Sequence, residues 1–159
     1  MHDADGKLCL IANAIGAFFD LNAKKAIKVD PEVFNVSFDE AEEMECLPRK
    51  IPVPTGVAGE TVPAFVVKPS DLDPNGHLTS PVYLAIASNA LKTDFAYSRV
   101  RIEYKQQAKA GSFVLPVVYY DGDKAVVDMK SGDGISYAVA EFSTAVFQEY
   151  DQKQNEVER

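Results

Sequence analysis

The sequence contains few side chains whose types and spacing indicate a reaction. The string closest to a serine-nucleophile motif is Gly134-Ile135-Ser136-Tyr137-Ala138, which lacks the final glycine and follows a predicted hairpin turn. Both histidines, His2 and His77, precede this serine, whereas a nucleophile elbow needs its histidine later in the chain. The sequence therefore does not predict acyl transfer by a serine nucleophile.

Metal and phosphate sites are not predicted either. Structural zinc sites need closely paired cysteines and histidines, and Cys9, Cys46 and the two histidines are not paired in this way. Asp121-Gly122 resembles a fragment of a calcium loop, but a tight turn demands the same residues. Gly56 and Gly59 lack the Lys-Ser or Lys-Thr that completes a phosphate-binding loop. We expect no metal and no cofactor.

Two charged clusters of opposite sign are the candidate binding residues. One is basic and alternates along an expected strand, and the other belongs to an acidic run at residues 39–45. Complementary charges steer proteins together, so we predict that they bind a protein partner or further copies of this chain. A solvated strand face and a solvated helix face also explain them. The six residues are Arg99, Arg101, Lys105, Glu42, Glu43 and Glu45.

Length and composition are typical of one globular domain. The chain has 159 residues, of which 47% are hydrophobic and 25% are charged. Its net charge of -8 argues against general binding to a nucleic-acid backbone. The sequence begins without a secretory signal and contains no apolar stretch long enough to span a bilayer. We expect no membrane partner and a cytoplasmic location, or a virion if the protein is viral.

The region from Gly111 to Thr144 predicts three antiparallel strands joined by two turns. Apolar runs at 113–120 and 125–129 flank Asp121-Gly122, a strong hairpin signal. A second turn at 131–134 leads into a third strand at 135–142. Pairing Lys130 with Ile135 would place Lys124 opposite Glu141. The residues expected on the other face are Ala125, Val127, Ala138 and Ala140.

The remaining elements are less clearly marked. Residues 8–19 fit either a helix or a strand, 24–29 and 33–38 read as short strands, and 82–87 reads as a buried strand. Alternation over 98–105 predicts a strand with one wet face. Residues 47–74 contain six prolines and predict an extended excursion with at most one edge strand near 61–67. Residues 151–159 read as a frayed polar tail.

These elements predict a mainly β fold: an antiparallel β-sandwich or partly open barrel with one or two short helices, in a single domain spanning residues 1–159. The absence of a catalytic motif and the two charged clusters favour a non-enzymatic structural protein, such as a self-assembling coat or lattice-binding decoration subunit. The alternative is a ligand-binding β-barrel. In it, tyrosines such as Tyr97, Tyr119 and Tyr137 would line a site for a small molecule, a sugar or single-stranded nucleic acid.

Overall fold

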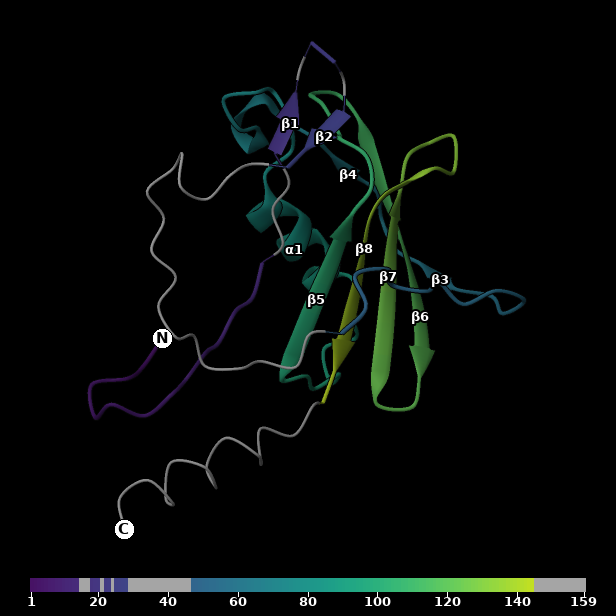
Figure 1. The fold of residues 1–159 in the computed structure, drawn as a ribbon. Coiled ribbons are helices and arrows are strands. Elements are labelled where there is room, and N and C mark those ends of the chain that lie inside the picture. Colours follow the sequence, from purple (N-terminus) through teal and green to yellow (C-terminus); the bar gives the residue numbers. More distant parts are fainter. Residues whose placement is uncertain (15–17, 21, 24, 29–46, 145–159) are drawn as a thin grey trace. The chain divides into compact units, whose positions relative to one another are not determined.

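The fold is taken from a computed structural model, which describes residues 1–14, 18–20, 22, 23, 25–28 and 47–144 (Figure 1). The chain divides into two compact units, residues 1–48 and residues 49–159, and each is described by itself. The predicted strand at 33–38, the acidic residues Glu42, Glu43 and Glu45, and the polar tail at 151–159 lie outside the described residues.

The first unit contains a small hairpin made of β1 (Phe18–Asp20) and β2 (Lys25–Ile27), which pairs Phe18 with Ile27. The Asp20 side chain accepts backbone hydrogen bonds from Asn22 at 2.8 Å and Ala23 at 2.9 Å, which fixes the turn. The strand predicted at 24–29 is thus confirmed at its centre. For residues 8–19 neither alternative holds over the described part, because residues 9–14 form neither a helix nor a strand and β1 begins only at Phe18.

The second unit is built on an antiparallel sheet. Its strands are β3 (Glu60–Thr61), β4 (Phe65–Val66), β5 (Arg99–Tyr104), β6 (Phe113–Asp121), β7 (Lys124–Lys130) and β8 (Ser136–Ser143). They lie in the order β3-β6-β7-β8-β5, and β4 also pairs with β6. The mainly antiparallel β fold with a short helix is therefore confirmed (Figure 1).

The two C-terminal hairpins form where the turn residues predicted them. Gly122, with φ of 60°, lies between Asp121 and Lys124, which pair directly. In the second hairpin the predicted register is wrong by two residues, because Lys124 pairs with Ser143 and Val126 with Glu141. A bulge at Met129/Lys130 and a turn closed by the Ser131 N–H to the Ile135 carbonyl explain the shift. A shift of two residues leaves every side chain on the same face of the sheet. The four residues predicted to share one face, Ala125, Val127, Ala138 and Ala140, are accordingly all buried.

Residues 82–87 were predicted to be a buried strand, and this prediction is wrong. They belong to helix α1 (Ser80–Asn89), which begins after Thr79 and has Pro81 in its first turn, where a missing N–H costs no hydrogen bond. Tyr83, Ile86 and Ala87 form its buried stripe. No described helix is long and apolar enough to cross a membrane.

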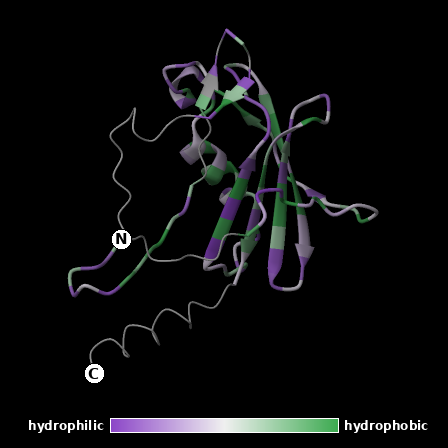
Figure 2. Ribbon diagram, in the orientation of Figure 1, coloured by the Kyte–Doolittle hydropathy of each residue, from purple (hydrophilic) through white to green (hydrophobic). Residues whose placement is uncertain are grey.

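The main core lies between α1 and one face of the sheet. The sheet contributes small side chains under the helix, Ala125, Ala138 and Ala140, which leave room for it to pack closely. Larger residues such as Met129 and Phe142 fill the space around them. Figure 2 shows the hydrophobic and hydrophilic residues alternating along β5, as expected for a strand whose faces meet different surroundings.

The opposite face of the sheet is crossed by the proline-rich segment. Residues 49–59, which we call the strap, bury Ile51 against Val126 and Val139 and bring Gly59 against β6. The segment then supplies both β3 and β4, so the prediction of at most one edge strand is wrong. The proline-rich segment therefore packs on its own unit, because it pairs with β6 and is partly buried. Val57, in the strap, is exposed.

Candidate functional site

A closed polar loop lies directly before α1 and presents an asparagine and a histidine. Asp73 organises it: its Oδ1 accepts hydrogen bonds from the backbone N–H groups of Asn75 and His77, each at 2.9 Å. The Asp73 N–H donates to the His77 carbonyl at 2.8 Å, and the Gly76 N–H donates to the Asp73 carbonyl at 2.9 Å. Gly76 has φ of 76°, a conformation that glycine adopts without strain. We call residues 73–77 the polar loop.

The electrostatics of the polar loop favour an ionised Asp73. The backbone hydrogen bond from His77 is the main cause that lowers the pKa of Asp73. The hydrogen bonds from Asn75 and the charge of His77 act in the same direction, and desolvation opposes them. Asp73 therefore remains a charged acceptor near neutral pH and holds the loop in one conformation.

The polar loop is anchored to the core on both sides. Leu72 and Leu78 form a β-bridge across its base, and the Leu78 N–H donates to the Ala108 carbonyl at 2.9 Å. The Tyr83 hydroxyl accepts a hydrogen bond from the Ala108 N–H at 3.1 Å, which ties α1 to the same segment. Burial raises the pKa of Tyr83, so this hydroxyl stays neutral. The loop therefore sits on a rigid base.

The two presented side chains are suited to acid–base and polar chemistry. The imidazole of His77 has two ring nitrogens, of which one can accept a proton and return it. The Asn75 amide can donate a hydrogen bond to an oxygen that gains negative charge. Asn75 is exposed and His77 is partly buried, so both can be reached from solvent.

The sequence prediction missed this site. Asn75-Gly76 is by itself typical of a turn, and His77 was considered only as a triad member or a zinc ligand. The signal that could have found it is the string Asp71-Leu72-Asp73-Pro74-Asn75-Gly76-His77, in which polar side chains alternate immediately before a helix. Among the described residues no group of three or more histidine, cysteine, aspartate or glutamate side chains could hold a metal ion.

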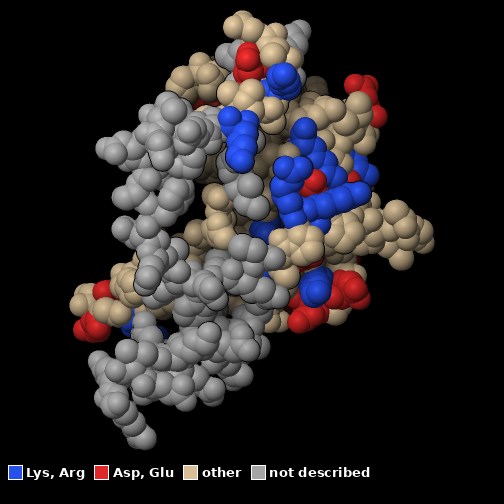
Figure 3. Space-filling view, in the orientation of Figure 1, with Lys and Arg blue, Asp and Glu red and all other residues tan. Residues whose placement is uncertain are grey.

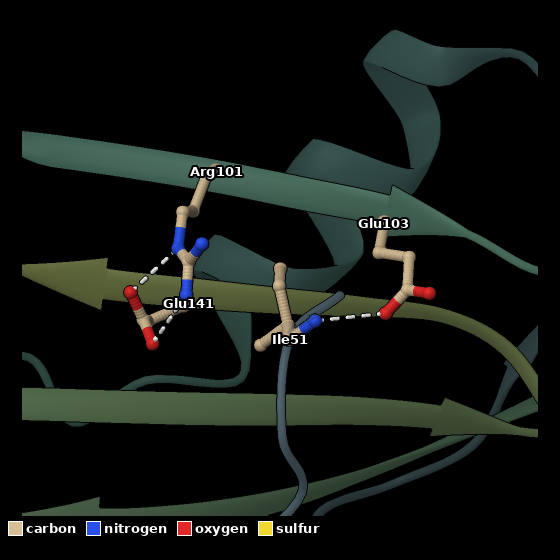
Figure 4. Close-up of polar contacts among 4 residues, drawn as sticks. All are labelled: Ile51, Arg101, Glu103 and Glu141. Atoms are coloured by element: carbon tan, nitrogen blue, oxygen red, sulfur yellow. Dashed lines mark hydrogen bonds and ion pairs between the residues drawn. The ribbon is translucent and has the colours of Figure 1, made fainter. Parts of the chain in front are cut away.

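The predicted basic residues lie elsewhere, on the sheet face under the strap. Arg101 makes a two-pronged contact with Glu141, with Nε to Oε1 at 2.7 Å and Nη2 to Oε2 at 3.1 Å (Figure 4). The side chain of Arg101 is 22% exposed and that of Glu141 is 13% exposed. The wet strand face predicted here is therefore partly covered. The strap covers part of this face, since its Ile51 N–H donates to Glu103 at 3.0 Å.

The charges on this face are partly neutralised within the chain. Hydrogen bonds from Arg101 are the main cause that lowers the pKa of Glu141, with burial acting in the opposite direction. Lys105 Nζ lies 3.9 Å from Glu103 Oε2. The structure thus brings Arg99, Arg101 and Lys105 together along β5 and its exit.

No protein-family model matches the chain, and no curated protein matches it. Solved structures do. An acyl-ACP thioesterase from Bacteroides thetaiotaomicron matches with a TM-score of 0.66 and 18% identity over 79% of this chain and 52% of that one. The 12:0-ACP thioesterase from Umbellularia californica matches with a TM-score of 0.56 and 16% identity over 79% of this chain and 52% of that one. This chain thus spans about half the length of these structures.

A third structure, assigned as an oleoyl thioesterase from Lactobacillus plantarum, has a TM-score of 0.59 and 18% identity over 80% of this chain and 55% of that one. These likenesses overturn the functional predictions. The similar structures are enzymes, so the predictions of a non-enzymatic coat or decoration subunit, of a virion protein and of a ligand-binding barrel are wrong. The antiparallel sheet with α1 packed on one face is a thioesterase-like hotdog fold.

Proposed function

We propose that this chain is a thioesterase domain that hydrolyses acyl thioesters at the polar loop. One observation supports it above the others: Asp73 fixes the backbone that presents Asn75 and His77, at the start of the helix in a fold similar to that of acyl-ACP thioesterases. Similarity of fold alone does not assign a reaction, so the residues of the loop carry the argument.

The reaction needs a base, an acid and a stabilised oxyanion. His77 takes a proton from water as the water oxygen attacks the carbonyl carbon of the thioester. The Asn75 amide donates a hydrogen bond to the carbonyl oxygen as negative charge develops there. The carbon–sulfur bond then breaks, and the leaving thiolate takes the proton back from His77. The products are a carboxylic acid and a free thiol, so all atoms of water and thioester are accounted for.

The test measures thiol release from acyl thioesters of several chain lengths, including decanoyl-CoA, by the purified chain. We expect H77Q to lower kcat by a factor of roughly 100 to 10,000, the range typical of a general base. We expect N75A to lower kcat by a factor of roughly 100, as loss of one oxyanion donor does.

The chain offers a matched control, because His2 is the only other histidine. H2Q should leave kcat and KM unchanged. Equal activity of H77Q and the wild-type protein would refute the assignment of His77. Absence of hydrolysis by the wild-type protein, for both CoA and carrier-protein thioesters of every chain length, would refute the proposed function.

A further inference from the structure

Tyr83 brings a hydroxyl group into the core between α1 and the sheet. The residue is 3% exposed. Its ring packs against the ring of Tyr104, the last residue of β5, with centroids 5.7 Å apart and an angle of 63° between the planes. A phenylalanine would fill the same space without a polar atom, and burial of a hydroxyl costs free energy unless the group is hydrogen-bonded. The value of a tyrosine here therefore depends on what its hydroxyl binds.

The Tyr83 hydroxyl both accepts and donates a hydrogen bond. It accepts one from the Ala108 N–H at 3.1 Å and donates one to the Gln106 carbonyl at 3.4 Å. Only a neutral hydroxyl can do both, and burial, which raises the pKa of Tyr83, keeps the proton on it. Ala108 is 0% exposed, so water does not reach its N–H as a substitute partner. Tyr83 therefore fixes residues 106–108 relative to α1.

Residues 106–108 connect Tyr83 to His77 through one further hydrogen bond. The Ala108 carbonyl accepts the N–H of Leu78 at 2.9 Å, and Leu78 directly follows His77. A second connection runs through the first turn of the helix, where the Tyr83 N–H donates to the Thr79 carbonyl at 3.2 Å. Tyr83 is thus connected to the residues that follow His77 both by its hydroxyl and by its backbone.

We propose that Tyr83 is a positioning residue, whose hydroxyl sets where His77 lies relative to α1 and to the exit of β5. Asp73 fixes the conformation within the polar loop, whereas Tyr83 fixes the loop on its base. Reacting groups must stay within about 0.5 Å of their productive positions, so a loose base lowers the rate even when the loop itself is intact. The effect on catalysis rests on the proposed function, and the effect on the loop does not.

The first test measures the loop without any substrate. Y83F deletes the hydroxyl and keeps the ring, and amide hydrogen exchange followed by NMR reports the opening of single hydrogen bonds in the full chain. We expect the amides of Leu78 and Ala108 to exchange roughly ten-fold faster in Y83F than in the wild-type protein. Y137F is the matched control: Tyr137 packs against the same core, and its hydroxyl makes no hydrogen bond within the described part of the chain. Unchanged exchange in Y83F, or equal acceleration in both variants, would overturn the proposal.

The second test measures thioester hydrolysis. Y83F should lower kcat roughly ten-fold and leave KM within about two-fold, because the hydroxyl positions a reacting group and binds no substrate. The substitution changes no charge, so the lysine and arginine side chains gathered over the sheet attract an anionic CoA thioester as before (Figure 3). In the H77Q background Y83F should have no further effect on kcat, because both substitutions act through His77. An equal fall in kcat with and without His77 would overturn the positioning role.

I86V separates positioning from general stability, because it trims the buried stripe of α1 and leaves the Tyr83 hydroxyl in place. It should lower the melting temperature and keep the wild-type kcat; a fall in kcat as large as that of Y83F would overturn the proposal.

The positioning role and the reaction can fail separately. Hydrolysis that H77Q abolishes and Y83F leaves unchanged would overturn the role of Tyr83 and keep the proposed function. Faster amide exchange in Y83F, in a chain that hydrolyses no thioester, would support the hold of Tyr83 on the loop and refute the reaction.

Discussion

Asp73 and His77 are joined by two hydrogen bonds that run in opposite directions. The His77 N–H donates to the Asp73 carboxylate at 2.9 Å, and the Asp73 N–H donates to the His77 carbonyl at 2.8 Å. The pair closes a five-residue loop in which the polar side chains besides that of Asp73 are those of Asn75 and His77. Asp73 therefore acts as a positioning residue, and its removal should affect catalysis without removing a reacting group.

The first prediction concerns this positioning role. D73A deletes the acceptor of two backbone hydrogen bonds, so the loop loses its fixed conformation and kcat should fall by a factor of roughly 100, as small misplacements of reacting groups do. D73N keeps one side-chain oxygen as an acceptor and should retain more activity than D73A. Hydrolysis assays measure the effect of each variant on activity. Thermal unfolding shows whether the variant also destabilises the whole fold.

The control for Asp73 is D133N, which changes an exposed aspartate in the turn before β8. D133N should behave like the wild-type protein in both assays. Full activity of D73A would contradict the positioning role. If Asp73 acts in the loop, D73A should lower kcat without changing the melting temperature, and D73N should restore part of the activity. A role of Asp73 in the core would instead lower the melting temperature.

The second prediction concerns pH and the Arg101–Glu141 pair. The pKa of Glu141 is lowered from its ordinary value of 4.5, chiefly by the hydrogen bonds from Arg101. A carboxyl group with a lowered pKa in the folded state stabilises the fold above its ordinary pKa, and this stabilisation is lost as the pH falls through the folded-state pKa. The free energy of unfolding of the wild-type protein should therefore fall below about pH 4.5.

E141Q removes the titrating group and keeps the shape. Its free energy of unfolding should be lower by about 1 kcal/mol at pH 7, the usual size for a partly exposed pair, and should fall less steeply in acid. Urea titrations between about pH 3 and pH 7 measure both quantities. E60Q is the control, because Glu60 pairs with Lys92 on the surface, where its side chain is 56% exposed. Identical pH slopes for E141Q and the wild-type protein would contradict the assignment.

The C-terminal strands were predictable because each local signal there agrees with the tertiary structure. Apolar runs at 113–120 and 125–129 with an intervening Asp-Gly specify a hairpin without help from the rest of the chain. The register of the next hairpin was not predictable, because the bulge at Met129/Lys130 adds a residue that no sequence pattern marks. The face of each side chain survives a shift of two residues, so the buried set was correct.

The helix and the site were missed for a related reason. Val82–Ala87 is a short apolar run that periodicity alone cannot assign to helix or strand, and Pro81 was not weighed as a helix-start signal. With α1 read as a strand, the polar residues before it appeared to lie in an ordinary turn. The position of His77 at the start of a helix packed on the sheet exists only in the folded unit.

The strap also escaped prediction, since its prolines indicated an excursion and its burial depends on long-range contacts. Ile51 is 2% exposed because Val126 and Val139 lie beneath it, more than 70 residues later in the chain. The apolar residues between the prolines of the strap were the signal for its burial. The prediction gave more weight to the prolines, because proline cannot donate a backbone hydrogen bond to a neighbouring strand.

The last prediction tests how tightly the strap meets the sheet. A Cβ atom added at Gly59 would overlap Val117 Cγ1 and lie 2.8 Å from Tyr119 Cε1, closer than atoms in contact can approach. G59A must therefore displace the strap, the edge strand β3 that follows it, or the side chains of Val117 and Tyr119, at a cost of about 1–3 kcal/mol in the free energy of unfolding. The matched control is G132A, because a Cβ at Gly132 meets nothing within 4 Å. Urea unfolding should show G59A destabilised and G132A close to the wild-type protein; equal stabilities of the two variants would mean that the strap is not packed against β6 in solution.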